Sequence, residues 1–215
     1  MKIKKLILIV ISVLLLSGCT NINDLDYDDI LVTFTHDSKN ANKTRSGYKY
    51  YLPSDMNVIN YGPYYEIIKS SKNYYYLYVD MISYINKSEF KYEINKDAEY
   101  SKIINNDGKY GYLEINLVEN NQYLIEIMYN YAKIEVMVDS NLLNEALIYS
   151  VNILNSVEYN NSVINSLLNK DALNYTEEEF DLFKTGVDNK STIDYIDEEP
   201  DNTEEDKIID TDYVD

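Results

Sequence analysis

The chain has 215 residues and contains 19 Lys and Arg against 37 Asp and Glu, which gives a formal net charge of −18. A field of that sign repels nucleic acid and anionic lipid headgroups, so neither is expected as a partner. With only six Gly and no glycine-rich phosphate loop, the sequence also gives no reason to expect a nucleotide.

The N-terminus has the pattern of a secretory signal. Lys2, Lys4 and Lys5 precede an apolar run, Leu6–Leu16, that only Ser12 interrupts. A helix needs about 20 apolar residues to span a bilayer, so this run is short for a permanent anchor. A basic start followed by a short apolar core is typical of a cleaved signal peptide.

The next residues, Leu16, Ser17, Gly18 and Cys19, match the lipobox of bacterial lipoproteins at all four positions. This resemblance implies that residues 1–18 are removed and that Cys19 carries a diacylglycerol as the first residue of the mature protein. It also implies a location on the outer, extracytoplasmic face of the cell membrane, held there by the acyl chains. Cys19 is the only cysteine in the chain, so it has no disulfide partner within it.

Charge and composition divide the mature chain. Residues 1–18 contain three Lys and no acid, so their removal leaves a net charge of −21, of which residues 176–215 carry −13. Residues 19–46 are rich in Asp, Asn, Lys and Ser and are expected to be a tether, in which only Ile30–Phe34 has the pattern of a short strand. The expected domain is 47–168, followed by a short helical extension at 169–186 and a disordered acidic tail at 187–215. The tail is either a solubilising end or a weak site for Ca²⁺ or a basic partner.

The middle of the chain is rich in Tyr, Ile and Val, which favour strands. Pro53 ends the first expected strand, Asn106-Asp107-Gly108 is a turn signal, and residues 119–121 have the length and composition of a hairpin loop. Residues 95–106 are polar without a clear period and are expected to be a short helix or a loop. The expected strands are 48–52, 64–69, 73–84, 110–118, 122–131 and 133–138.

After the last expected strand the apolar residues recur at helical spacing. The positions run from Leu143 through Ala146 and Leu147 to Leu154, which predicts an amphipathic helix over about 140–157, with a shorter one at 162–168. Strands followed by helices indicate an α+β fold, with the long helix packed on an antiparallel meander.

Two segments carry a resemblance to the PsbP/Mog1-like domains of small bacterial lipoproteins. They are the entry run Gly47–Ser54, with Leu52-Pro53 near its end, and the helix exit Ile153–Val157. The resemblance implies an α/β/α-type domain that acts as a non-enzymatic assembly or binding module.

The sequence contains few of the residue patterns that active sites use. The only histidine is His36 in the expected tether, where a solvated role is the ordinary interpretation. Ser70-Ser71-Lys72 has the residue types of a Ser–Lys site but not its helical spacing. No cysteine and histidine spacing of a zinc site occurs. No enzyme activity, cofactor or metal is therefore expected.

Two other groups of residues keep alternatives open. The carboxylates Glu66, Asp80, Glu114 and Glu126 lie on expected strands, where they either line a solvated face or converge in pairs as in a glycan-active enzyme. The chain also has 24 Tyr and no Trp. Alternation places Tyr74, Tyr76 and Tyr78 on one face of a strand, as a ligand platform or as ordinary packing residues.

Together these features predict a lipid-anchored surface protein with a non-catalytic binding or assembly domain. Its partner is expected to be an envelope protein or wall glycan, and glycan binding through the tyrosine face is the alternative. A carboxylate-based glycan-active enzyme is the third possibility.

The processing prediction can be checked by intact-mass spectrometry of the protein from its native membrane. We expect a mass that begins at Cys19 and includes acyl chains, which lipase treatment removes. A mass that includes residues 1–18 and no lipid would show that Leu6–Leu16 remains as an anchor.

Overall fold

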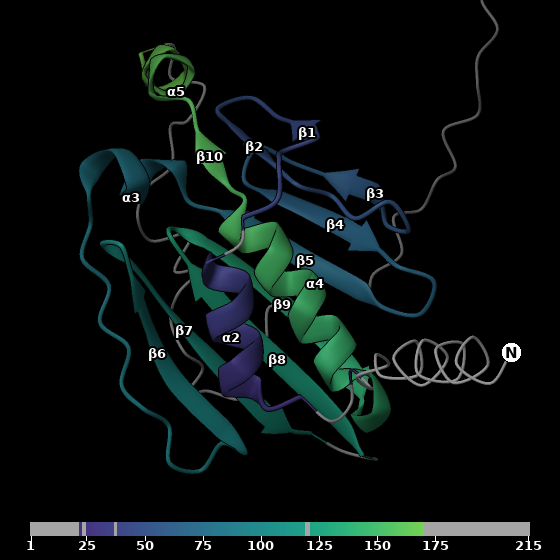
Figure 1. Ribbon diagram of the computed structural model, residues 1–215. Coiled ribbons are helices and arrows are strands. Elements are labelled where there is room, and N and C mark those ends of the chain that lie inside the picture. Colours follow the sequence, from purple (N-terminus) through teal and green to yellow (C-terminus); the bar gives the residue numbers. More distant parts are fainter. Residues whose placement is uncertain (1–21, 23–24, 37, 119–120, 170–215) are drawn as a thin grey trace, which may run out of the picture. The chain divides into compact units, whose positions relative to one another are not determined.

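The computed structural model describes residues 22, 25–36, 38–118 and 121–169, and for 34–36 it describes the backbone only (Figure 1). The predicted signal at 1–18, the extension from 170 onward and the acidic tail at 187–215 lie outside the described residues. The predicted fold class is confirmed: the chain is α+β, with a 16-residue helical segment packed on a seven-stranded antiparallel sheet.

The large sheet is made of two meanders, β3-β4-β5 and β6-β7-β8-β9, which join where β5 pairs with β9. Its order is therefore β3-β4-β5-β9-β8-β7-β6. The strands are β3 (Asn57–Tyr61), β4 (Tyr65–Lys69), β5 (Tyr74–Val79), β6 (Tyr100–Asn106), β7 (Lys109–Leu117), β8 (Gln122–Tyr129) and β9 (Ala132–Asp139).

Three expectations about strands were wrong or incomplete. Residues 100–106 form the edge strand β6 rather than a helix or loop, because pairing with β7 supplies the order that its polar sequence does not show. The strand expected to run to residue 84 ends at Val79, since Asp80 caps the helix α3 (Met81–Asn86). The other edge strand, β3, was not expected at all; edge strands often lack a strong apolar pattern.

One face of the sheet, called the helical face below, packs against α2 (Tyr27–His36) and against the helical segment η2 (Ser140–Leu142) and α4 (Leu143–Asn155). Figure 1 shows α2 and α4 side by side across this face. The buried side chains between the layers include Leu77, Leu113, Ile125, Ile134 and Val136 from the sheet and Ala146, Leu147, Val151 and Leu154 from α4. Among the described residues no helix is long and apolar enough to cross a membrane.

The expected tether is partly wrong, because residues 27–36 form α2 and belong to the packed domain. Ile30 and Leu31, expected in a strand, lie on the buried side of this helix and join the main core. Asn144 of α4 donates hydrogen bonds of 2.8 Å to the carbonyls of Ile22 and Leu25, which ties the chain before α2 to α4. The acidic composition misled the prediction because Asp28 and Asp29 occupy the first turn of the helix, where carboxylates are favourable.

A second, three-stranded sheet has the order β1-β2-β10, from β1 (Lys43–Thr44), β2 (Tyr48–Tyr50) and β10 (Glu158–Tyr159). It connects the end of α4 to the segment after α2, since the Tyr51 amide donates to Oγ of Ser156, 2.8 Å away. The last described helix, α5 (Asn161–Leu168), confirms the predicted short helix.

The small sheet is held to the large one by the fully buried carboxylate of Glu66 on β4, whose exposure is 0%. Arg45 contacts it with Nη2 at 2.6 Å, and the hydroxyls of Tyr48 and Tyr50 donate to it at 2.9 and 3.0 Å. Burial and the Glu66 carboxylate raise the pKa of both tyrosines, so both phenols stay protonated as donors. Glu66 thus has a cation and two neutral donors, as a buried carboxylate requires.

We expect Arg45→Met to lower the free energy of unfolding by about 3 kcal/mol in urea denaturation, because it leaves Glu66 buried without its cation. Lys49→Met is the matched control. Lys49 forms an ion pair of 2.8 Å with Glu158, but both side chains are exposed, so its loss should cost less than about 1 kcal/mol. Equal effects of the two substitutions would contradict the structural role of Glu66.

Candidate functional site

The face of the large sheet opposite α2 and α4, called the open face below, carries a row of three glutamates. Glu114 on β7 is directly opposite Glu126 on β8, and Glu126 is directly opposite Glu135 on β9. Side chains at opposed positions share a face of the sheet and lie close together, so like charges there are destabilising. The row is therefore not explained by sheet stability alone.

The described residues around the row supply hydrogen bonds to it. Glu114 accepts from the hydroxyl of Tyr92 and from the amides of Asn95 and Asn116, at 2.9 and 2.8 Å. Tyr112 donates to Glu126. Lys133 and Glu135, each only 2% exposed, form an ion pair of 2.8 Å.

The pKa of Glu126 is raised, first by burial and then by the neighbouring carboxylates of Glu135 and Glu114. Lys133 and the hydrogen bond from Tyr112 oppose the shift. A carboxyl with a raised pKa beside other carboxylates is one arrangement that active sites use for proton transfer. Structural networks also produce such shifts, so the geometry around the row has to decide between the two.

Of the four predicted carboxylates, the structure brings together Glu114 and Glu126. Glu66 lies on the helical face with Arg45, and Asp80 caps α3 by accepting from the Ser83 amide at 2.8 Å. The expectation of a solvated face is wrong for Glu66 and Glu114, since both are buried. Sequence reasoning missed Glu135, although its alternation with Ile134 and Val136 in β9 already placed it opposite the core.

The three tyrosines of the predicted platform differ in how far they are exposed to solvent. Tyr75 and Leu77 enter the core, so Tyr74, Tyr76 and Tyr78 share the open face as alternation predicts. Tyr74 is 44% exposed, but Tyr78 is only 5% exposed and its ring lies 5.8 Å from Nζ of Lys133. Tyr78 therefore packs into the charged row, which leaves Tyr74 as the accessible end of the platform.

The remaining predicted site residues take no part in a shared site within the described chain. The lipobox Leu16–Cys19 lies outside the described residues, and the backbone of His36 ends α2. Oγ of Ser70 accepts from the amide of Asn73 at 3.0 Å and so stabilises the β4–β5 turn. No group of three or more His, Cys, Asp or Glu side chains among the described residues is arranged to hold a metal ion.

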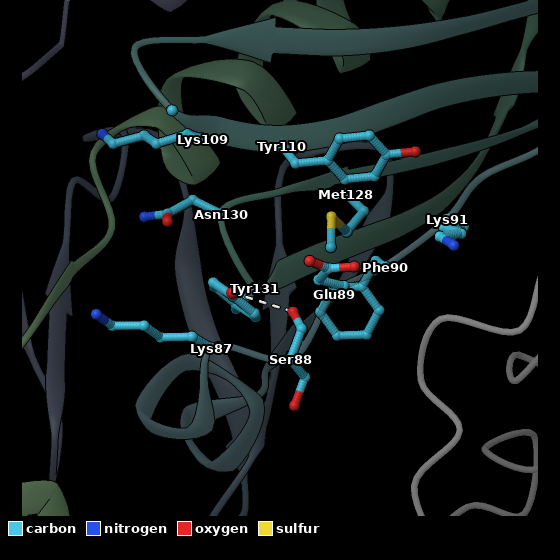
Figure 2. A pocket seen from close by; sticks show the side chains of 11 residues that line it. Lys87, Ser88, Glu89, Phe90, Lys91, Lys109, Tyr110, Met128, Asn130 and Tyr131 are labelled. Carbon is cyan, nitrogen blue, oxygen red and sulfur yellow. Dashed lines mark hydrogen bonds between the residues drawn. The ribbon is translucent and has the colours of Figure 1, made fainter.

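A cavity of about 250 Å³ lies at one end of the sheet and was not expected from the sequence. Two hairpin turns and the segment after α3 form its wall; Figure 2 shows Tyr110 and Met128 of β7 and β8 facing Ser88 and Phe90 across it. We call it the turn pocket. Its lining residues are Lys87 to Lys91, Gly108 to Tyr110, Met128, Asn130 and Tyr131.

The turn pocket is built from residues with left-handed backbone conformations. Asn130 and Tyr131 form the β8–β9 turn with φ values of 51° and 64°, and Asp107 and Gly108 form the β6–β7 turn with 50° and 75°. Lys87, which ends α3, has a φ of 53°. Two consecutive positive φ values are the signature of a two-residue hairpin turn that matches the twist of its strands.

Tyr131 is the strained member of this group, because Gly is the usual residue at its turn position and a bulky side chain there is disfavoured. Its ring meets those of Phe90 and Tyr84 edge-on at 5.5 and 5.8 Å, and its hydroxyl donates to the Ser88 carbonyl at 3.1 Å. The tyrosine thus fixes the segment that forms the opposite wall. Strain that is kept in order to position a wall is a recognised feature of functional sites.

A second cavity, of about 10 Å³, lies between the helices and the sheet and is lined by Leu31, Ile104, Val151 and other core residues. Its volume is about the minimum that one water needs, so it is a packing gap. Neither cavity is lined by Glu114, Glu126 or Glu135. The turn pocket is much the larger of these two cavities, and it is the candidate site.

We expect Glu126→Gln to stabilise the fold near pH 7 by roughly 1 kcal/mol, because it removes opposed like charges but keeps an oxygen that accepts from Tyr112. A carboxyl whose pKa is raised on folding binds its proton more tightly in the folded chain, so its cost grows as pH rises above the ordinary glutamate value of about 4.3. The gain should therefore shrink toward pH 4. Urea denaturation at both pH values measures this, with the exposed Glu158→Gln as control. A variant less stable than the parent at pH 7 would contradict the account.

In comparisons of this chain with known proteins, no protein-family model, no curated protein and no solved structure matches. The interpretation of the turn pocket therefore rests on its own geometry. The resemblance of Gly47–Ser54 and Ile153–Val157 to PsbP/Mog1-like domains stays a prediction.

Proposed function

We propose that this protein is a lipoprotein of the outer face of the cell membrane, and that its domain binds an envelope partner without catalysing a reaction. The partner is an envelope protein or a wall glycan, and it inserts one of its groups into the turn pocket. The observation that carries the proposal is the construction of this pocket from turn residues with positive φ, including the strained Tyr131.

A pocket of this kind favours binding because its walls are fixed before the ligand arrives. Hairpin turns of two residues hold Asn130 and Gly108 in place, and the ring of Tyr131 braces Phe90. Binding to an ordered site avoids the entropy of ordering loops on association. The backbone strain at Tyr131 therefore keeps the pocket wall ordered before the ligand binds.

The absence of catalysis is proposed from the engagement of the carboxylates. Glu66 and Asp80 have structural contacts described above, and both oxygens of Glu114 accept hydrogen bonds from neighbouring side chains. The Glu114–Glu126 pair is the observation that favours the second candidate, a glycan-active enzyme. It ranks behind binding because neither carboxylate lines the turn pocket or the second, smaller cavity. For glycan binding by the tyrosine face, only Tyr74 and the half-buried Tyr76 are accessible among the three predicted tyrosines.

The anchoring part of the proposal follows from the lipobox. Acyl chains on Cys19 hold the mature protein at the membrane surface, and one chain alone gives only marginal binding, so two or more are needed. The described domain begins within a few residues of Cys19, at Ile22 and Leu25. The anchor therefore keeps the domain close to the bilayer, where envelope components near the membrane can reach it.

The binding role can be tested with a photo-reactive benzophenone side chain at the position of Asn130, in the lipid-anchored protein on intact cells. We expect light to produce one discrete cross-linked product. Asn121 is the matched control, because it is also an Asn in a turn with positive φ, 64°, at the opposite end of β8.

The eight residues of β8 lie between the two positions, which places them roughly 31 Å apart at about 3.4 Å per residue. A product from position 130 that is absent at position 121 supports the turn pocket as the binding site. Products of equal yield at both positions, or none at 130, would contradict it.

A further inference from the structure

We propose that the ligand group of the turn pocket is a small anion joined to a ring or another compact apolar part. This inference deepens the proposed function and rests on it. It names the chemistry that the pocket recognises, which is a carboxylate or a phosphate beside an apolar group.

Charge is the first support for the inference. The pocket is lined by Lys87, Lys91 and Lys109 against the single acid Glu89, so its lining has a charge of +2, whereas the whole chain has −18. None of the three lysines forms an ion pair with another described residue. A local positive site on an acidic protein attracts an anion selectively, because the surrounding field repels anions elsewhere.

The arrangement of the lining is the second support. Figure 2 shows the side chains of Lys87 and Lys109 extending on the same side of the pocket, with the amide of Asn130 between them. Ammonium groups and an amide N–H₂ are donors that suit the oxygens of a carboxylate or phosphate. Nζ of Lys109 lies 5.8 Å from the centre of the Tyr129 ring, and the backbones of Lys87 and Asn130 are held in left-handed conformations.

The apolar part of the ligand is inferred from the rest of the wall. Phe90, Tyr110 and Met128 contribute aromatic and thioether surface, and Met128 is buried at the base of the small cluster that they form with Tyr92 and Tyr112. Aromatic rings and methionine pack well against flat rings and compact apolar groups. A fully hydrated inorganic anion would leave this surface unused.

Size limits the ligand to one such unit. The cavity of about 250 Å³ is below the range of about 300–1,000 Å³ that is typical of drug-sized ligands. A single ring with its acid group fits this scale, whereas an oligosaccharide or peptide would place most of its length outside. The pocket is therefore suited to one terminal or projecting acidic group of an envelope partner.

Glu89 sets the orientation of the ligand. In Figure 2 it lies beside Phe90, on the opposite side of the pocket from Lys87, Asn130 and Lys109. Figure 2 draws Lys91 on the same side as Glu89, which offsets its charge there, so the acid group should point toward Lys87 and Lys109. Glu89 thus disfavours the reversed orientation of the ligand. Neutralising Glu89 should therefore raise the affinity for an anion, whereas neutralising Lys87 and Lys109 should lower it.

The test uses ¹⁵N-labelled mature protein with Cys19→Ser, which carries no lipid, and three probes that differ in one group. Benzoate carries a carboxylate on a ring, benzamide is its neutral counterpart, and phenyl phosphate replaces the carboxylate by a phosphate. We expect benzoate or phenyl phosphate to shift the amide resonances of Lys87, Gly108 and Asn130, and the tighter of the two identifies the acid. Benzamide should bind at least tenfold more weakly.

Substitutions give the second part of the test. The double change Lys87→Gln and Lys109→Gln should weaken benzoate binding by roughly tenfold, and Glu89→Gln should tighten it by about two- to fivefold, as expected for charges a few ångström away in water-exposed surroundings. Lys72→Gln is the control, because Lys72 lies in the β4–β5 turn at the other end of the sheet. It should leave the affinity unchanged.

The outcomes separate this inference from the proposed function. Equal binding of benzamide and benzoate, or no effect of the lysine substitutions, would overturn the anionic ligand. Shifts by none of the probes would overturn it as well. In each of these cases the cross-linking from Asn130 still decides whether the turn pocket binds an envelope partner.

Discussion

The buried carboxylate of Glu66 is the interaction on which the arrangement of this domain depends. It draws Arg45, Tyr48 and Tyr50 toward β4, which places the small sheet beside the large one. Gly47 then lies so close to α3 that a Cβ there would be 2.5 Å from Sδ of Met81, and α3 ends at Lys87, where the wall of the turn pocket begins. A series of contacts thus runs from the buried charge of Glu66, through Gly47 and Met81, to the segment that lines the candidate site.

The two faces of the large sheet follow different rules. The helical face has continuous apolar packing under α2 and α4, which accounts for the stability of a chain without an internal disulfide. On the open face, Glu126, Glu135 and the adjacent Lys133 are largely removed from solvent. Hydrogen bonds and one ion pair compensate for the burial of these charged groups. Strand β8 carries both Glu126 of the row and Met128 of the pocket. The polar network around Glu126 therefore helps to hold the strand that carries Met128 in position.

The sequence predicted correctly those segments whose residue types or apolar spacing match the element that forms. Strand-favouring residues and turn signals in β7, β8 and β9, with the helical spacing from Leu143 to Leu154, were enough to predict the α+β sheet and its main helix. The edge strands β3 and β6 were missed, since their order comes from pairing rather than from composition. The turn pocket was also beyond prediction, although Asp107-Gly108 was a visible turn signal. Its residues come from three separate segments, and Tyr131 at a turn position favoured by glycine has no signature in a single sequence.

The turns that frame the pocket also bear on how the site can change over generations. Loops that border binding sites usually vary in length, and insertions there are a common route to new specificity. Here each turn has two residues, and its length fixes the register of the hairpin. One inserted residue would shift the alternation of β8 or β7 and move Glu126 and Met128 to the wrong face. Lineages of this protein should therefore diversify the pocket by exchanging side chains at Lys87, Glu89, Asn130 and their neighbours, while the lengths of the two turns stay constant.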